Sequence, residues 1–142
     1  MRIHVILYVR DQDLATRFYR ETLALEPRLH VPGMTELAIG DAVLGLMPEA
    51  GIKRLLGEAL PDPAKGHGIP RAELYLVVDD PAAYHARALA AGARELSALQ
   101  PRDWGHDVAY SLDLDGHVLA FARLTSRGWA SARRSRSSRP AS

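Results

Sequence analysis

Two apolar segments decide how this chain folds: IHVILYV at residues 3–9 and AELYLVV at residues 72–78. Each segment is rich in β-branched residues, has one polar residue at its second position and leads into acidic residues that suit a helix start. The two polar residues, His4 and Glu73, occupy matching positions. Because repeated segments of this kind indicate a duplicated module, the sequence predicts two similar halves.

The composition is that of an ordinary globular domain. Of 142 residues, 47% are apolar and 25% charged. The absence of cysteine excludes disulfides, thiol nucleophiles and thiolate metal ligands from this sequence. No apolar run reaches membrane-spanning length and no secretory signal pattern opens the sequence. We therefore expect a single cytoplasmic domain that is not associated with a membrane.

The charges are distributed unevenly along the chain. Residues 123–142 contain six arginines and no acidic residue, which leaves 12 basic and 17 acidic side chains, a net charge of −5, in residues 1–122. The Ser- and Arg-rich tail lacks apolar periodicity, and we expect it to be disordered. Its role stays open. The acidic remainder argues against nucleic-acid binding.

Hydrophobic periodicity and turn residues predict the order β-α-β-β-β in each half. In the first half we expect a strand over 2–9 covered on both faces and a helix over 12–24, followed by strands over 28–31, 34–39 and 42–47. Asp11 or Asp13 would cap the helix, Pro27 would end it, and its buried side would carry Leu14, Phe18 and Leu25.

The second half repeats this order after a Pro- and Gly-rich linker over 49–71, which has a short helix near 52–60. We expect a strand over 72–78, a helix over 82–91 that follows Asp79-Asp80-Pro81 and stops at Gly92, and strands over 93–97, 107–112 and 117–122. Between the last two strands, Asp113-Leu114-Asp115-Gly116 suits a hairpin turn.

This element order, together with Trp104-Gly105 and the later Asp113-Leu114-Asp115-Gly116-His117, resembles the vicinal oxygen chelate superfamily. That superfamily includes glyoxalase I, extradiol dioxygenases, and fosfomycin- and bleomycin-resistance proteins. Relatives often carry WG…DPDGN, where this chain has Leu114 for Pro and His117 for Asn. The resemblance covers residues 2–122 and is nearest to bleomycin-resistance-type members.

The resemblance implies an α+β fold in which two βαβββ modules form cupped mixed β-sheets with helices packed outside. The modules would span about residues 2–48 and 72–122 of a domain over 1–122. Relatives commonly build their pockets between two modules, often across a homodimer, so the resemblance also implies a homodimer.

Metal-using relatives place four ligands at positions that correspond here to His4, Gly45, Glu73 and Ala120. Relatives that bind metal have a carboxylate where this chain has Ala120, and Gly45 has no side chain to offer. Because a catalytic ion normally has at least three protein ligands, we expect no metal cofactor. If a divalent metal is bound, the resemblance makes His4 and Glu73 its ligands.

Alternation along the strands indicates which side chains share the cupped face with His4 and Glu73. We expect a mostly apolar ligand pocket, with Trp104 at its rim, lined by His4, Ile6, Tyr8, Met47, Glu73, Tyr75, Trp104 and Ala120. The other histidines are not expected to be ligands: His30 in a strand, His67 in the linker, His85 on an exposed helix, His106 in a loop, and His117 pointing away from the pocket.

Three functions remain open at this point. The first is a metal-independent protein that binds and sequesters a drug or metabolite, as bleomycin-resistance-type relatives do. The second is a metal-dependent lyase, isomerase or dioxygenase. The third is a metal-free enzyme with Glu73 as base and Tyr8 or His4 as proton donor. His4 and Glu73 fit a structural ion pair as well as an acid–base pair. The net charge of −5 favours cationic or polar ligands, whereas His4 favours an anion.

Overall fold

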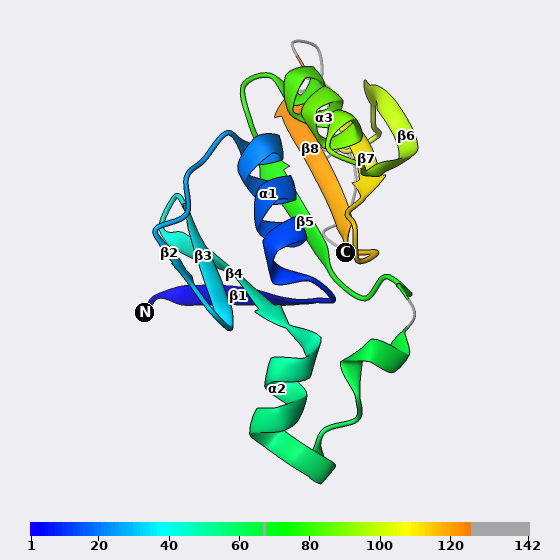
Figure 1. Cartoon of the computed structure of the whole chain (residues 1–142). Helices are drawn as coiled ribbons and strands as arrows, with labels where there is room; N and C mark the ends of the chain where they lie inside the picture. Colours follow the sequence, from blue (N-terminus) through cyan, green and yellow to red (C-terminus); the bar gives the residue numbers. More distant parts are fainter. Residues whose placement is uncertain (67, 126–142) are drawn as a thin grey trace. The chain divides into compact units, whose positions relative to one another are not determined.

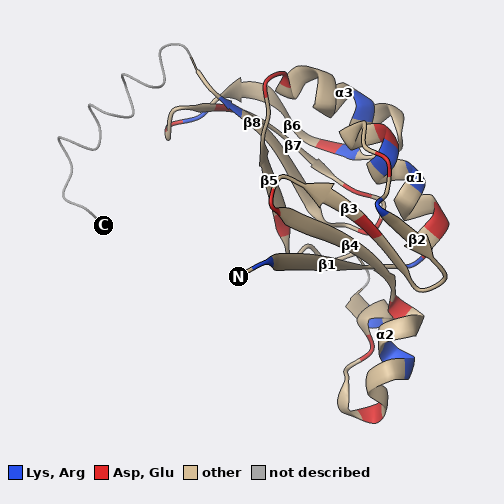
Figure 2. Ribbon diagram, turned by 90° about the vertical axis from the view of Figure 1, so that its left-hand side faces the viewer, with Lys and Arg blue, Asp and Glu red and all other residues tan. Residues whose placement is uncertain are grey.

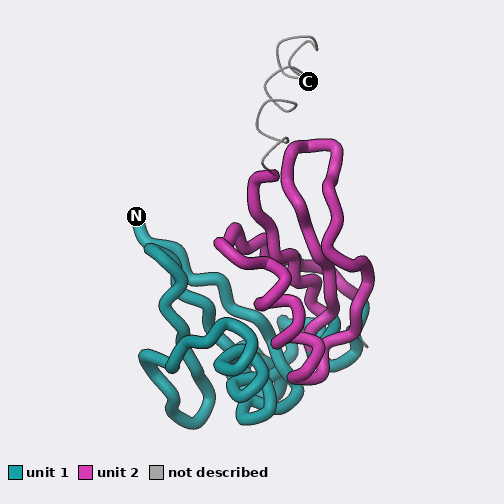
Figure 3. Tube along the Cα trace, turned by 90° about the horizontal axis from the view of Figure 1, so that it is seen from above, with its two compact units in different colours: residues 1–69, 114–116 teal, residues 70–113, 117–142 magenta. Residues whose placement is uncertain are grey.

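The computed structural model describes residues 1–66 and 68–125 and separates into two compact units (Figure 3). Unit 1 comprises residues 1–69 together with residues 114–116, and unit 2 comprises residues 70–113 and the chain from 117 onward. His67 and the Arg-rich segment 126–142, which carries most of the predicted disordered tail, lie outside the described residues.

Unit 1 begins with a strand, a helix and three further strands, as the sequence predicts (Figure 1). Its elements are β1 (Ile3–Val9), α1 (Gln12–Leu23), β2 (Leu29–Val31), β3 (Met34–Ile39), β4 (Ala42–Pro48), α2 (Glu49–Leu56) and the 3₁₀ turns η1 (Gly57–Ala59) and η2 (Pro63–Gly66). The strands form one sheet in the order β1-β4-β3-β2. Only the β1–β4 pairing is parallel.

Unit 2 repeats this topology. Its elements are β5 (Glu73–Val77), α3 (Pro81–Ala90), β6 (Arg94–Pro101), β7 (His106–Leu112) and β8 (Val118–Leu124). The sheet order is β5-β8-β7-β6, and its first and last strands again pair in parallel. The predicted α+β fold of two βαβββ modules, with mixed sheets and helices packed outside, is therefore confirmed.

Local sequence explains where the helices begin. The Asp11 carboxylate accepts a hydrogen bond from the Leu14 backbone N–H at 3.0 Å, so Asp11 is the cap of α1. Asp80 caps α3 in the same way through the Ala83 N–H at 3.2 Å, and Pro81 opens that helix.

The buried side of α1 differs from the prediction, whereas its end falls within one residue of the predicted one. The helix ends at Leu23, before Pro27, because Ala24 turns into the left-handed conformation with φ 55°. Phe18 is buried as predicted. Leu14 is 56% exposed and Leu25 37% exposed, so placing them on the buried side was wrong. The buried face of α1 instead carries Ala15, Thr16, Phe18, Tyr19, Thr22 and Leu23.

The first strand is covered on only part of one face, which corrects the prediction that it is covered on both. Leu7 and Val9 are buried. Ile6 and Tyr8, on the opposite face, are 42% and 36% exposed. On the same face as Leu7 and Val9, Ile3 and Val5 are 59% and 37% exposed, so burial is confined to the second half of the strand.

Charged residues lie mostly on helices and turns, whereas the strands are largely uncharged (Figure 2). Within residues 1–66 and 68–125, no helix combines the length and apolar character needed to cross a membrane.

Candidate functional site

The unit 1 sheet has one face that turns away from α1, here called the unit 1 face. Thr35 marks the opposite side, because its hydroxyl contacts that of Thr16 in α1 at 2.8 Å. Strand register then assigns alternate residues to the unit 1 face. These residues are His4, Ile6 and Tyr8 of β1, Met34, Glu36 and Ala38 of β3, and Val43, Gly45 and Met47 of β4.

A charged group lies on the unit 1 face around Glu36. The Arg28 Nε donates to Glu36 Oε1 at 3.0 Å, and Arg28 Nη2 forms an ion pair with the same oxygen at 3.0 Å. The other carboxylate oxygen, Oε2, is 3.5 Å from His4 Nδ1. The Glu36 side chain is only 17% exposed, while those of His4 and Arg28 are each 42% exposed. Glu36 therefore anchors two more exposed nitrogen-bearing groups.

Gly45 fits closely beneath its neighbours on this face. A Cβ placed on Gly45 would lie 3.0 Å from Ile6 Cγ1 and 3.3 Å from Met34 Sδ. Even one added methyl group would press on both side chains. The position therefore has no space for a metal-binding side chain unless Ile6 and Met34 move.

The corresponding face of unit 2 turns away from α3 and is here called the unit 2 face. Phe121 lies on the α3 side, with its ring centroid 5.6 Å from that of Tyr84. Its neighbour Ala120 therefore lies on the unit 2 face, paired in register with Tyr75 on one side and Tyr110 on the other. Both tyrosines pack on a cluster that includes Ala120, which is fully buried.

A hydrogen-bonded aromatic group surrounds Tyr75. Trp104 Nε1 donates to the Tyr75 hydroxyl at 2.9 Å, and that hydroxyl lies 2.5 Å from His106 Nδ1. The Tyr75 and His106 rings are also stacked at 5.8 Å. Because the indole N–H can only donate, the Tyr75 oxygen accepts from it, and one further proton lies between Tyr75 and His106. Trp104 is 47% exposed and can contact a ligand.

Tyr110 borders this aromatic group. Burial, followed by the charge of Glu73 and the nearby Tyr75, raises the pKa of Tyr110, and Arg102 opposes that shift. The Arg102 guanidinium lies 5.1 Å from the centre of the Tyr110 ring and donates to the Val108 carbonyl at 2.8 Å. The raised pKa means that ionisation of the Tyr110 phenol is disfavoured further.

The predicted site residues fall into two groups. His4, Ile6, Tyr8 and Met47 share the unit 1 face, and Glu73, Tyr75 and Ala120 share the unit 2 face, where Trp104 bonds to Tyr75. The proposed pairing of His4 with Glu73 joins the two units and stays a prediction. Within residues 1–66 and 68–125, no three His, Asp or Glu side chains gather in a way that suits a metal ion.

Sequence reasoning missed four residues of these faces: Arg28, Glu36, His106 and Tyr110. His106 belongs to β7, not to a loop. Strand alternation in residues 34–39 and 107–112 was the available signal, because it places Glu36 and Tyr110 on the same faces as the predicted residues.

Two other histidines have structural contacts. His85, predicted to be exposed, has a side chain only 8% exposed, and its Nε2 lies 2.9 Å from Glu95. His30 Nδ1 contacts the Thr35 hydroxyl at 2.9 Å. Each contact joins a histidine to a neighbouring strand, which gives the histidine a structural role that requires no ligand.

Comparison with known proteins identifies relatives of this fold. The sequence matches the family model of the Glyoxalase/Bleomycin resistance protein/Dioxygenase superfamily over residues 2–121. A glyoxalase-related enzyme from Fulvimarina pelagi is 22% identical, with a TM-score of 0.74 and 87% of each chain covered. A glyoxalase/bleomycin resistance protein/dioxygenase family enzyme from Burkholderia phytofirmans PsJN is 21% identical, with a TM-score of 0.74 and coverage of 86% of this chain and 97% of that one.

TioX from Micromonospora sp. ML1 is 24% identical, with a TM-score of 0.65 and coverage of 88% of this chain and 99% of its own. At these identities the similarity to solved structures establishes the fold alone. No curated protein matches the sequence significantly.

Proposed function

This chain belongs to the Glyoxalase/Bleomycin resistance protein/Dioxygenase superfamily, and we propose that within it the protein binds a small molecule without using a metal ion. Membership confirms the resemblance seen in the sequence. Because proteins that share a fold differ in function, membership does not decide between binding and catalysis, and that decision depends on the residues of the two faces.

The observation that carries the proposal is the burial of Ala120 between Tyr75 and Tyr110. Metal-using relatives have a carboxylate at this position, whereas here two phenol rings pack over a methyl group. Gly45, the equivalent position in unit 1, has no space for a ligand side chain. Two of the four expected ligand positions therefore do not fit a metal ion, and the two that remain fall short of the usual three.

The unit 2 face offers a different kind of binding surface. Trp104 is partly exposed, and Tyr75, His106 and Tyr110 provide rings with polar atoms at their edges. Aromatic side chains with a few placed polar groups are typical of sites for flat organic molecules. We propose that a drug-like molecule or metabolite stacks on Trp104 and is held without being altered.

Metal addition tests the metal-independent part of the proposal. We expect Ni²⁺, Mn²⁺, Zn²⁺ and Fe²⁺ to leave the melting temperature of the protein nearly unchanged, because a ligand that does not bind the native state cannot stabilise it. Thermal unfolding with and without each metal measures this, with His4→Ala as the matched variant. Strong stabilisation of the parent that His4→Ala abolishes would instead favour the metal-dependent lyase, isomerase or dioxygenase.

Tryptophan substitution tests the binding surface. The chain has two tryptophans, Trp104 on the unit 2 face and Trp129 in the tail. For any compound that raises the melting temperature in a screen, we expect Trp104→Phe to weaken affinity about threefold to tenfold, because the smaller ring offers less stacking area and the Nε1 donor to Tyr75 is lost, and aromatic contacts are worth roughly 0.5–1.5 kcal/mol. Trp129→Phe is the matched control and should leave affinity unchanged. Equal effects of the two variants would place the ligand elsewhere.

We also propose a cytoplasmic homodimer. The absence of cysteine supports the compartment, because secreted domains of this size often depend on disulfides. The exposed apolar side chains of the edge strand β1 support the dimer.

A further inference from the structure

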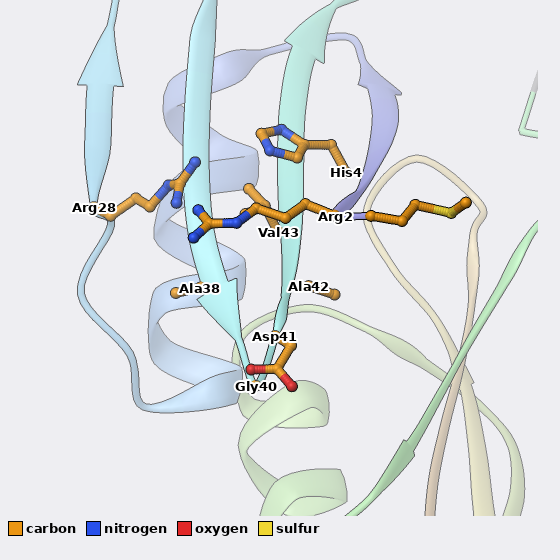
Figure 4. Close-up of a pocket in the computed structure, with 9 residues that line it drawn as sticks. Arg2, His4, Arg28, Ala38, Gly40, Asp41, Ala42 and Val43 are labelled. Atoms are coloured by element: carbon orange, nitrogen blue, oxygen red, sulfur yellow. The ribbon is translucent and has the colours of Figure 1, made fainter.

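A pocket on the unit 1 face combines two arginines with an apolar wall (Figure 4). It has a volume of about 400 Å³ and lies beside the turn between β3 and β4. Arg2, His4 and Arg28 line it together with Asp41, and Ala38 and Val43 form part of its apolar wall. In Figure 4 the side chain of Arg2, which lies just before β1, and that of Arg28, which lies just before β2, extend toward each other.

The arginines keep most of their hydrogen-bonding capacity available to a ligand. A guanidinium has five N–H donors, and Arg28 directs two of its nitrogens at Glu36 Oε1. Within the part of the chain that the structure describes, Arg2 has no hydrogen bond or ion pair with a protein group. Glu36 therefore orients Arg28, while Arg2 remains the more adaptable cation.

Two guanidinium groups that share a pocket repel each other unless an anion lies between them. Glu36 offsets the positive charge of Arg28, and only 17% of the Glu36 side chain is exposed to solvent. Asp41, at the pocket margin, works against an incoming anion. The negative net charge of residues 1–122 acts over longer range and is screened beyond about 8–10 Å in physiological salt, so the local arginines dominate.

We propose that this pocket binds the carboxylate of a small organic anion. The carboxylate lies between Arg2 and Arg28, where planar guanidinium groups match its two oxygens, and the apolar body rests on Val43 and Ala38. This inference goes beyond the proposed function, because it assigns a ligand class to the unit 1 face, whereas the proposed stacking site lies on the unit 2 face. It uses none of the residues that the Trp104 test addresses.

Benzoate and benzamide are the probes, because they have nearly the same shape and differ in charge. The full-length protein, in buffer freed of metal by a chelating resin, is labelled with ¹⁵N and titrated by NMR. EDTA is omitted because it is itself a polycarboxylate. We expect benzoate to shift the amide signals of Arg2, His4 and Val43 and to bind at least about tenfold more tightly than benzamide, given the strength of hydrogen bonds to charged groups.

Three variants should change the affinity for benzoate in different ways. Arg2→Gln should weaken benzoate binding about tenfold, and because Arg2 has no partner among the described residues, the fold should not suffer. Asp41→Asn should tighten binding about threefold by removing the opposing charge. Arg54→Gln, on α2, is the matched control and should leave affinity unchanged.

Two results would overturn the assignment. Equal affinity for benzoate and benzamide, or equal effects of Arg2→Gln and Arg54→Gln, would show that the pocket does not recognise a negative charge. Inorganic phosphate that binds as tightly as benzoate would show that the apolar wall plays no part, and would overturn the organic carboxylate. Failure here leaves the metal and Trp104 results intact, so the two proposals fail separately.

Discussion

Gly116, in the turn that follows Asp113, shows how strongly a single residue is constrained in this fold. Its φ is +91°, a backbone conformation that residues with a side chain rarely adopt. A Cβ there would lie under 3.0 Å from three backbone atoms of Gly68. Backbone atoms cannot move aside as the end of a side chain can. Gly116 therefore allows a close approach between two segments as well as an unusual turn.

We expect Gly116→Ala to lower the free energy of unfolding by more than about 2 kcal/mol, because the left-handed conformation alone costs roughly 1–2 kcal/mol and the contact with Gly68 adds to it. Gly33→Ala is a matched control: its φ is +96°, and no atom lies within 4 Å of the added Cβ. Urea unfolding of both variants gives the comparison. A loss no larger for Gly116→Ala than for Gly33→Ala would mean that the Gly68 segment moves away without cost.

At the scale of elements, the Gln12 side chain makes three of the hydrogen bonds that join α1 to the β2–β3 hairpin. Gln12 Oε1 accepts from the Gly33 N–H at 2.9 Å, while its Nε2 donates to the Val31 carbonyl at 2.8 Å and the Thr35 hydroxyl at 3.0 Å. Thr35 also contacts Thr16 and His30. The start of the helix and the hairpin are thus joined by a polar network.

Removing this link should destabilise unit 1. We expect Gln12→Ala to cost about 2–3 kcal/mol, since three hydrogen bonds of roughly 0.5–1.5 kcal/mol each are lost. Gln100→Ala, which removes a single exposed bond to Ser97 at 3.1 Å, should cost well under 1 kcal/mol. Chemical denaturation followed by circular dichroism measures both. Similar losses would indicate that water replaces the Gln12 contacts.

At the scale of the whole molecule, β1 is an edge strand whose apolar side chains remain exposed. Ile3 is 59% and Val5 37% exposed, in addition to Ile6 and Tyr8. Exposed apolar edges of this kind favour association. We expect a dimer at micromolar concentration in sedimentation experiments and a shift to monomer in Ile3→Lys. Leu55→Lys, on α2 and 71% exposed, is the control that should remain dimeric. A monomeric parent would contradict the dimer.

The repeated strand–helix–strand order was predictable because local patterns indicate it: the apolar, β-branched runs at residues 3–9 and 72–78, and the caps Asp11 and Asp80. Features that depend on distant partners were not. The buried position of His85, for example, depends on Glu95 in the next strand. These interactions arise only when the elements pack.

The same limit applies to the candidate site. Alternation placed Tyr75 and Ala120 on one face, as register confirms. Glu36 gains its position from pairing opposite Gly45, and its partners Arg28 and His4 come from different elements. Likewise, the contact between Tyr75 and His106 bridges two strands that the sequence does not show to be neighbours on one face. Chemistry shared between strands appears only in three dimensions.

The inclusion of residues 114–116 in unit 1 has a consequence for how the protein is made. The backbone N–H and the Nε of Arg10 donate to Asp115 Oδ1 at 2.9 and 3.2 Å, and Arg10 Nη2 donates to the Leu114 carbonyl. Arg10 is synthesised more than 100 residues before its acceptors. The last contacts of unit 1 therefore cannot form until most of unit 2 has been synthesised.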